Sequence, residues 1–236
     1  MPVRSSPRTD GREALFRLLF RVFGVHCSLC GSPASDPCPD CLAQSGFNGR
    51  AHRSPQTPAG LISVWFCAPH VTPNGDASAL TTLLHRFKYG GDRRAGRILA
   101  AIFAGACSQC CEAGTIVVPV PADPSRLKAR GFDQAGWLAA GLSCKTGSRM
   151  NAQLLRRLPT STAQHGLNAL ARSKNLAGAF SSPSQPRLPS SSSKVLLVDD
   201  VMTTGATLNA CAAALHEQGI ERIAAAVLLY AQKPRR

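Results

Sequence analysis

The chain of 236 residues carries 27 Lys and Arg against 13 Asp and Glu, a formal net charge of +14 at pH 7. This excess predicts attraction to polyanions, a class that includes nucleic acids, acidic lipids and phosphorylated small molecules. Few aromatic residues lie among the scattered basic ones, so no stacking platform for single strands is predicted. No apolar run reaches the length of about 18 residues that a membrane-spanning helix needs. We therefore expect a cytoplasmic protein with one ordinary domain and a small accessory one.

The amino-terminal part contains a short apolar stretch, residues 14–25. Arg17 and Arg21 interrupt it and no A-x-A-like cleavage site follows, so the pattern is typical of an amphipathic helix and not of a signal peptide. We assign this helix and the cysteines that follow it to one unit, residues 1–48, called here the cysteine module. Residues 49–60, in a stretch rich in Gly, Pro, Ser and Arg, are predicted to be a linker.

Two Cys-x2-Cys pairs, separated by seven residues, lie in the cysteine module. Two intervening residues let both sulfurs of a pair reach one ion, and two pairs complete the tetrahedral shell of a structural Zn²⁺. The predicted ligands are Cys27, Cys30, Cys38 and Cys41. Two alternatives are that His26 replaces one of them, or that these are unligated structural cysteines. The other six cysteines are interpreted as ordinary buried or surface thiols.

The middle of the chain alternates between strand and helix patterns. Strands are predicted over 61–68 and 115–120, and helices over 77–87 and 97–107. The apolar strand over 115–120 is followed by a basic stretch, which we interpret as a loop that closes over a diphosphate and neutralises its charge. Its candidate residues are Arg126, Lys128 and Arg130. A solvated basic loop is an equally good interpretation.

Two further stretches lie before residue 195. Over residues 154–180, Gln164, Arg172 and Asn175 recur at near-helical intervals, either lining a cleft or facing water. Residues 181–194 are Ser- and Pro-rich and are predicted to be a flexible connector.

The strongest motif is VLLVDDVMTTGAT, residues 195–207. Its four leading apolar residues predict a buried parallel strand, and apolar residues at helical spacing follow it. Asp199 and Asp200 stand at the strand's end, placed to accept hydrogen bonds from a sugar diol. The turn opens a helix, where free N–H groups and the helix dipole favour a 5′-phosphate. Its residues are Thr203, Thr204, Gly205, Ala206 and Thr207. The alternative is an ordinary strand-to-helix turn whose polar residues only cap the helix.

This motif resembles the phosphoribosyl pyrophosphate (PRPP) motif of type I phosphoribosyltransferases. Together with the Cys-x2-Cys pairs, HRFKYGG, VVPVP, KARGFDQA and AQHGLNALARSKNLAGAF, it resembles the ComF branch of that superfamily over nearly the whole chain. In many relatives Asn-Gln follows RGF, whereas this chain has Asp133-Gln134. Thr203 stands where the 6-oxopurine salvage branch has an Asp, so purine salvage is not expected.

The resemblance implies an α/β fold, a parallel sheet flanked by helices, over residues 61–236, with a small four-cysteine zinc module before it. It also implies PRPP binding with Mg²⁺ and a role in bacterial competence and DNA uptake. Asp199 and Asp200 would hold the ribose hydroxyls, and no general base for an acceptor can be named. One alternative is a non-catalytic nucleotide or PRPP sensor whose zinc module contacts single-stranded DNA or a DNA-uptake helicase. Another is a DNA binder by charge alone.

Overall fold

The structure is a computed structural model that describes residues 26–33, 35–72, 75–158, 178–183 and 193–231. The predicted helix over 14–25 and the polar residues Gln164, Arg172 and Asn175 lie outside the described residues, as does most of the predicted connector. Within the described ranges, no helix is both long enough and apolar enough to cross a membrane.

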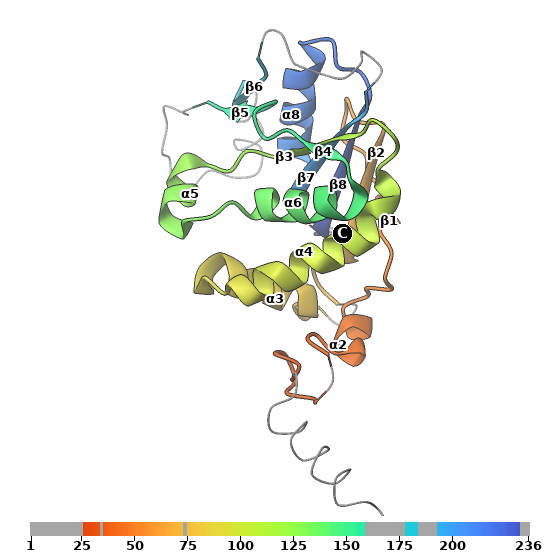
Figure 1. The fold of residues 1–236 in the computed structure, drawn as a ribbon, viewed down its shortest axis with the longest axis vertical. Helices are drawn as coiled ribbons and strands as arrows, with labels where there is room; N and C mark the ends of the chain where they lie inside the picture. The colour runs from red at the N-terminus through yellow and green to blue at the C-terminus, as the bar shows by residue number, and fades with distance from the viewer. Residues whose placement is uncertain (1–25, 34, 73–74, 159–177, 184–192, 232–236) are drawn as a thin grey trace, which may run out of the picture.

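A six-stranded sheet forms the centre of the molecule, in the strand order β1-β2-β8-β7-β3-β4 (Figure 1). Its neighbouring strands are parallel except for β1, which pairs antiparallel with β2 at one edge. The strands are β1 (His52–Arg53), β2 (Ser63–Pro69), β3 (Ile116–Pro119), β4 (Arg149–Met150), β7 (Val195–Met202) and β8 (Ile223–Tyr230). A separate pair consists of β5 (Arg156–Arg157) and β6 (Phe180–Ser181).

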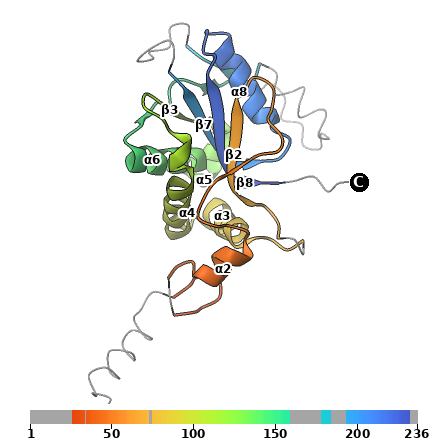
Figure 2. The ribbon, with the colours of Figure 1, turned by 90° about the vertical axis from the view of Figure 1, so that its right-hand side faces the viewer.

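Helices cover both faces of this sheet (Figure 2). Because side chains alternate along a strand, Leu196 and Val198 of β7 join the core beneath α3, α4 and α6, whereas Val195 and Leu197 join the core beneath α8. The helices are α2 (Pro39–Gln44), α3 (Ala79–Gly90), α4 (Arg93–Cys107), the 3₁₀ turn η1 (Ser108–Cys110), α5 (Pro124–Arg130), α6 (Gln134–Thr146) and α8 (Ala206–His216). Because helices cover both faces of the sheet, the apolar runs of β7 and β8 do not alternate with polar residues.

The described part of the cysteine module packs beneath α3 and α4 (Figure 1). Arg86 donates a hydrogen bond from Nη1 to the carbonyl oxygen of Ser28 at 3.0 Å. Arg94 forms an ion pair with Asp36, with 3.0 Å between Nη2 and Oδ2. These contacts attach the module to the sheet domain.

The segment predicted to be a linker is also attached to the sheet. It contains β1, and the backbone N–H of Ala51 donates to the carbonyl oxygen of Ala106 at 3.3 Å. The domain boundaries themselves remain a prediction.

Most predicted elements form where the sequence places them, with α/β order and a parallel β7–α8–β8 unit at the carboxyl-terminal end. The basic stretch was predicted to be a loop, which is wrong, because residues Pro124–Arg130 form the helix α5. Asp123 caps its first turn by accepting from the backbone N–H of Ser125, and Gly131 ends it in the left-handed conformation at φ 75°.

Candidate functional site

The acidic pair lies inside β7, because the strand continues past its apolar run to Met202. At the neighbouring strand end, the backbone N–H of Val120 donates to the carbonyl oxygen of Val198 at 2.8 Å. The residues that follow β3 therefore lie directly beside the acidic pair. Since the carboxyl ends of parallel strands are where open α/β sheets bind ligands, this edge is the candidate site.

The turn after β7 opens α8 without a side-chain cap at its N-cap position. That position is Gly205, at φ 75° in the left-handed region, and no side chain accepts a cap hydrogen bond there. The backbone N–H of Ala206 makes only a long contact with Oγ1 of Thr204, at 3.4 Å. Helix capping therefore does not account for the hydroxyl-rich turn, and the first N–H groups of α8 are available to an anion.

A hollow of about 230 Å³ lies beside this turn. It is lined by Gln56, Thr57, Pro58, Met202, Thr203 and Thr204. Residues 56–58 belong to the predicted linker, and no sequence signal marked them. Pro58 also touches the turn closely, because a Cβ atom built on Gly205 would overlap its Cγ atom. The hollow is of a size for a phosphate group, and its walls come from two distant parts of the chain.

The two aspartates make polar contacts beyond this hollow and do not line it. Oδ2 of Asp200 lies 2.7 Å from Nζ of Lys88 on α3, and both side chains are mostly buried, with exposures of 16% and 15%. Oδ1 of Asp199 accepts from the backbone N–H of Asp200 at 2.8 Å. Burial raises the pKa of Asp199 to about 8, and the negative charge of Asp200 adds to the rise. At neutral pH Asp199 is therefore largely protonated.

Asp133, the departure from the usual Asn-Gln pair, is close enough to interact with the acidic pair. Burial raises the pKa of its carboxyl group, the backbone N–H groups of Gly136 and Ala135 oppose the rise, and the charge of Asp200 adds to it. The carboxyl group also folds over the start of α6, since a Cβ atom on Gly136 would lie 2.8 Å from its Oδ2 atom. Three acidic side chains and one lysine thus form a single polar cluster.

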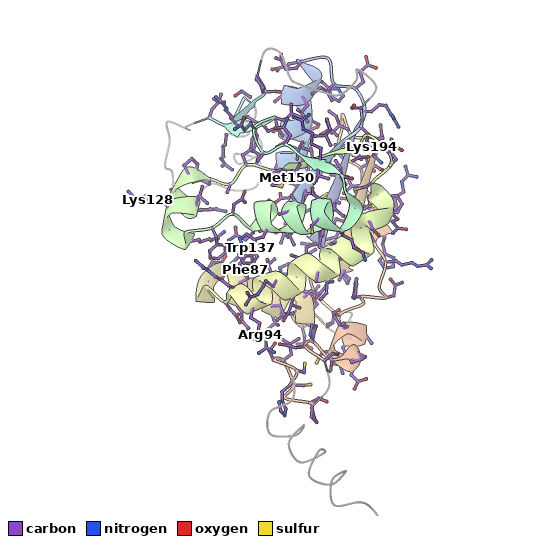
Figure 3. The ribbon with its side chains drawn as sticks, viewed as in Figure 1. Phe87, Arg94, Lys128, Trp137, Met150 and Lys194 are labelled. Carbon is purple, nitrogen blue, oxygen red and sulfur yellow. The ribbon has the colours of Figure 1, made fainter. Side chains whose placement is uncertain are left out.

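The three cations predicted to bind a diphosphate all lie on α5, but their side chains differ in exposure and contacts. Arg126 and Lys128 are exposed on α5, and Figure 3 shows Lys128 pointing outward from it. Arg130 instead contacts α6 and α3: its Nη1 atom donates to Oε1 of Gln134 at 3.3 Å, and its guanidinium lies 5.3 Å from the ring centroid of Tyr89. Lys88 and Gln134 were not predicted as site residues, although the motifs HRFKYGG and KARGFDQA contain them.

The four predicted metal ligands come together in the cysteine module. Sγ of Cys27 lies 3.9 Å from that of Cys41, and Sγ of Cys30 lies 3.6 Å from that of Cys38. All four sulfurs lie within 4.8 Å of one another. Four bonds of about 2.3 Å to a tetrahedral Zn²⁺ require sulfurs about 3.8 Å apart, so the spacing fits such an ion. His26 does not belong to the cluster.

The surroundings of Cys27 favour its thiolate form. Burial raises the pKa of Cys27, but hydrogen bonds from the backbone N–H groups of Cys38, Cys30 and Leu29 outweigh it and lower that pKa to about 6. The N–H of Cys38 lies 3.3 Å from Sγ of Cys27. Burial raises the pKa of Cys41, and the neighbouring cysteine side chains add to the rise. A bound metal ion would favour the thiolate form of this cysteine, because metal ligands must be deprotonated. The four cysteines could thus hold a metal ion such as zinc.

The remaining cysteines behave as the sequence indicated. Sγ of Cys67 lies 3.7 Å from Sγ of Cys107, and both residues are fully buried in the core beneath α4. Cys110 and Cys211 are also buried, whereas Cys144 is exposed on α6. All are free thiols.

Comparisons with known proteins show what the chain is similar to. Residues 145–236, which include the acidic pair and the turn, match the model of the phosphoribosyl transferase domain. The chain is 33% identical over 150 residues to Competence protein F of Haemophilus influenzae, covering 61% of this chain and 65% of that protein. It is 29% identical over 200 residues to DNA utilization protein YhgH of Salmonella typhimurium, covering 82% of this chain and 78% of that protein. The domain match and these relatives together support a ComF-family, type I phosphoribosyltransferase-like protein.

Proposed function

We propose that this chain binds PRPP, or a related ligand with a ribose 5-phosphate group, at the carboxyl end of β7. The observation that carries the proposal is the turn itself. Gly205 brings the backbone close to the hollow, and Thr203 and Thr204 line it with hydroxyl groups. The N–H groups at the start of α8 would bind the 5′-phosphate.

The acidic pair is assigned to the ribose. Asp199 and Asp200 would hold its hydroxyl groups, either by accepting hydrogen bonds from them or by ligating a Mg²⁺ ion that the hydroxyl groups also ligate. If the chain is an enzyme, an acceptor displaces pyrophosphate at the anomeric carbon, with a new glycosidic bond formed and the C–O bond to pyrophosphate broken. The negative charge of Asp200 would then stabilise the positive charge of the oxocarbenium-like transition state, and that positive charge would favour loss of the proton from Asp199. Among the described residues of the site, no side chain stands out as a general base for the acceptor.

The names of the relatives support a proposal for the biological role. One is named for competence and the other for DNA utilization. We propose that this chain likewise serves DNA uptake in bacteria, with single-stranded DNA and a DNA-uptake helicase as its partners. The net charge of +14 favours contact with DNA. If the affinity for single-stranded DNA did not change with salt concentration, the hypothesis that charge drives DNA binding would be excluded.

A non-catalytic sensor is the second candidate. The ion pair with Lys88 offsets the charge of Asp200, which leaves less negative charge to stabilise an oxocarbenium-like transition state. To separate the two candidates, the protein is incubated with PRPP, Mg²⁺ and a panel of bases, and pyrophosphate is assayed. Release with one base supports the enzyme, whereas binding without release supports the sensor.

Binding itself is tested by calorimetric titration with PRPP and Mg²⁺. We expect the double variant Asp199→Asn, Asp200→Asn to weaken PRPP binding at least about tenfold, since it removes the charge-assisted hydrogen bond of Asp200 and an oxygen ligand of Mg²⁺ from each residue. Its melting temperature is expected to fall little, because Asn keeps the shape of both side chains. Unchanged affinity for PRPP would exclude the acidic pair from the ligand site.

We also propose that the four cysteines hold one structural Zn²⁺. Metal analysis of the purified protein is expected to find close to one zinc per chain. Cys27→Ser with Cys38→Ser should abolish the zinc and melt the cysteine module, because both residues are buried at 2% exposure and a closed four-sulfur site contributes folding energy. The matched control, Cys144→Ser on α6, should keep the zinc. Zinc-free wild-type protein with the module still folded would contradict the assignment.

A further inference from the structure

A buried carboxylate joins the two halves of the cysteine module. Ser28 lies between the first pair of cysteines, and Asp36 lies just before the second pair. Oδ1 of Asp36 accepts two hydrogen bonds from Ser28, one from the backbone N–H at 2.8 Å and one from the side-chain hydroxyl at 2.7 Å. Only 4% of the Asp36 side chain is exposed, although Asp36 does not itself belong to the cysteine cluster. Its place in the fold is therefore between the two pairs of predicted ligands.

The second carboxylate oxygen of Asp36 is compensated by the sheet domain. Oδ2 is shielded from solvent and has no hydrogen-bond partner among the described residues, but it lies 3.0 Å from Nη2 of Arg94. Arg94 is in the first turn of α4, and Figure 3 shows it on the side of α3 and α4 that faces the cysteine module. A buried carboxylate oxygen that loses its cation costs free energy. The position of Asp36 thus depends on a residue outside the module.

A second arginine closes a ring of contacts around Ser28. Arg86 on α3 donates from Nη1 to the carbonyl oxygen of Ser28 at 3.0 Å, and its Nε and Nη2 atoms donate to Oδ2 of Asp92 at 3.1 and 2.6 Å. The other oxygen of Asp92 accepts from the backbone N–H of Arg94 at 3.0 Å. The N–H, the hydroxyl and the carbonyl group of Ser28 are therefore all held by side chains that the start of α4 orients.

These contacts bear on the four sulfurs in two ways. Fixing Ser28 fixes the backbone between Cys27 and Cys30, so the sulfurs keep the spacing that fits a tetrahedral ion, and less conformational entropy is lost on binding. In addition, four thiolates outweigh the charge of one Zn²⁺, so a loaded site is anionic and nearby guanidinium groups stabilise it.

We propose that Asp36 is a positioning residue for the zinc ion, and that its ion pair with Arg94 makes the zinc affinity depend on the sheet domain. This inference rests on the proposed zinc site, since it concerns the surroundings of the same four cysteines. The cysteine module therefore holds its metal ion as part of the whole chain and not as an independent unit.

The experiment measures the Zn²⁺ affinity of the full chain by competition with a chromophoric chelator, and far-ultraviolet circular dichroism checks that the sheet domain is folded. Asp36→Ala is expected to weaken zinc binding about 10–100-fold, the usual cost of removing a residue that orients metal ligands. Arg94→Met should weaken it by about threefold, a smaller effect because 58% of the Arg94 side chain is exposed and solvent screens its charge.

Combining the two substitutions tests the ion pair itself. In the Asp36→Ala background, Arg94→Met should change the zinc affinity no further, because the partner of the arginine is already gone. The matched controls are Asp40→Ala, an exposed acid on α2 between two of the ligands, and Arg93→Met, the exposed neighbour of Arg94. Both controls should keep the wild-type affinity within about twofold.

Wild-type zinc affinity in Asp36→Ala would refute the inference. Equal losses from Arg94→Met in both backgrounds would show that the ion pair does not position the metal site. If the cysteine module of Asp36→Ala does not fold, the comparison of Arg94→Met with Arg93→Met still decides, because both substitutions lie outside the module, and equal affinities would then refute the inference. If the wild-type chain binds no zinc, the zinc assignment itself fails, so the two failures are distinguishable.

Discussion

Replacing Gly205 by alanine is expected to abolish PRPP binding and to destabilise the fold. The residue has φ 75°, a conformation that costs an L-residue about 1–2 kcal/mol. The added Cβ atom would also overlap Cγ of Pro58, a ring atom that cannot rotate away. Overpacking of this kind costs about 1–3 kcal/mol more. To avoid this overlap, either residues 56–58 or the turn must move. Both segments line the hollow assigned to the 5′-phosphate, so either movement would change its shape.

Chemical denaturation and PRPP titration measure the two effects separately. The control is Gly147→Ala: Gly147 ends α6 at φ 69°, and a Cβ atom there would meet nothing within 4 Å. This variant carries the conformational cost without the overlap, so it should lose about 1–2 kcal/mol and keep its PRPP affinity. Equal behaviour of the two variants would mean that the contact between Pro58 and the turn has no role in binding.

The stability of the protein is expected to depend on pH through Asp199. An unfolded Asp loses its proton near pH 4, whereas burial raises the pKa of Asp199 in the folded chain to about 8. Between these values the folded state keeps a proton that the unfolded state has released. The free energy of unfolding therefore falls as the pH rises from about 4 to about 8 and is insensitive to this group outside that window, a change on the order of a few kcal/mol.

Asp199→Asn removes this titration, because its amide stays neutral at every pH. The variant should match the wild type near pH 4 and exceed it in stability at pH 9, measured by urea denaturation in buffer without Mg²⁺. Asp76→Asn, which changes an exposed acid away from β7, should keep the wild-type pH profile. A wild-type protein more stable at pH 9 than at pH 5, with Asp199→Asn showing the same rise, would contradict the assigned pKa of Asp199.

The sequence predicts the central β7–α8 part of the site because that part is local. The strand, the two acids and the turn occupy one stretch of the sequence, so the strand and the start of the helix that follows it are predicted together. The cysteine cluster is predictable for the same reason, since the two residues between paired cysteines determine how their sulfurs meet.

The other half of the site depends on how distant helices pack. Lys88 meets Asp200 only because Phe87 packs α3 against the corner at Phe132, and no spacing in the sequence encodes that contact. The hollow likewise needs Pro58 to lie over a turn that is far from it in the sequence. The helix α5 was predictable, since Asp-Pro at its start and Gly131 at its end are ordinary helix signals.

The most direct test of the central claim is nuclear magnetic resonance of the backbone amides during a titration with ribose 5-phosphate. The account predicts that the largest shifts fall on Thr204, Gly205, Ala206 and Thr207, whose N–H groups would bind the phosphate. Saturation with these four amides unmoved and the shifts located elsewhere would contradict it.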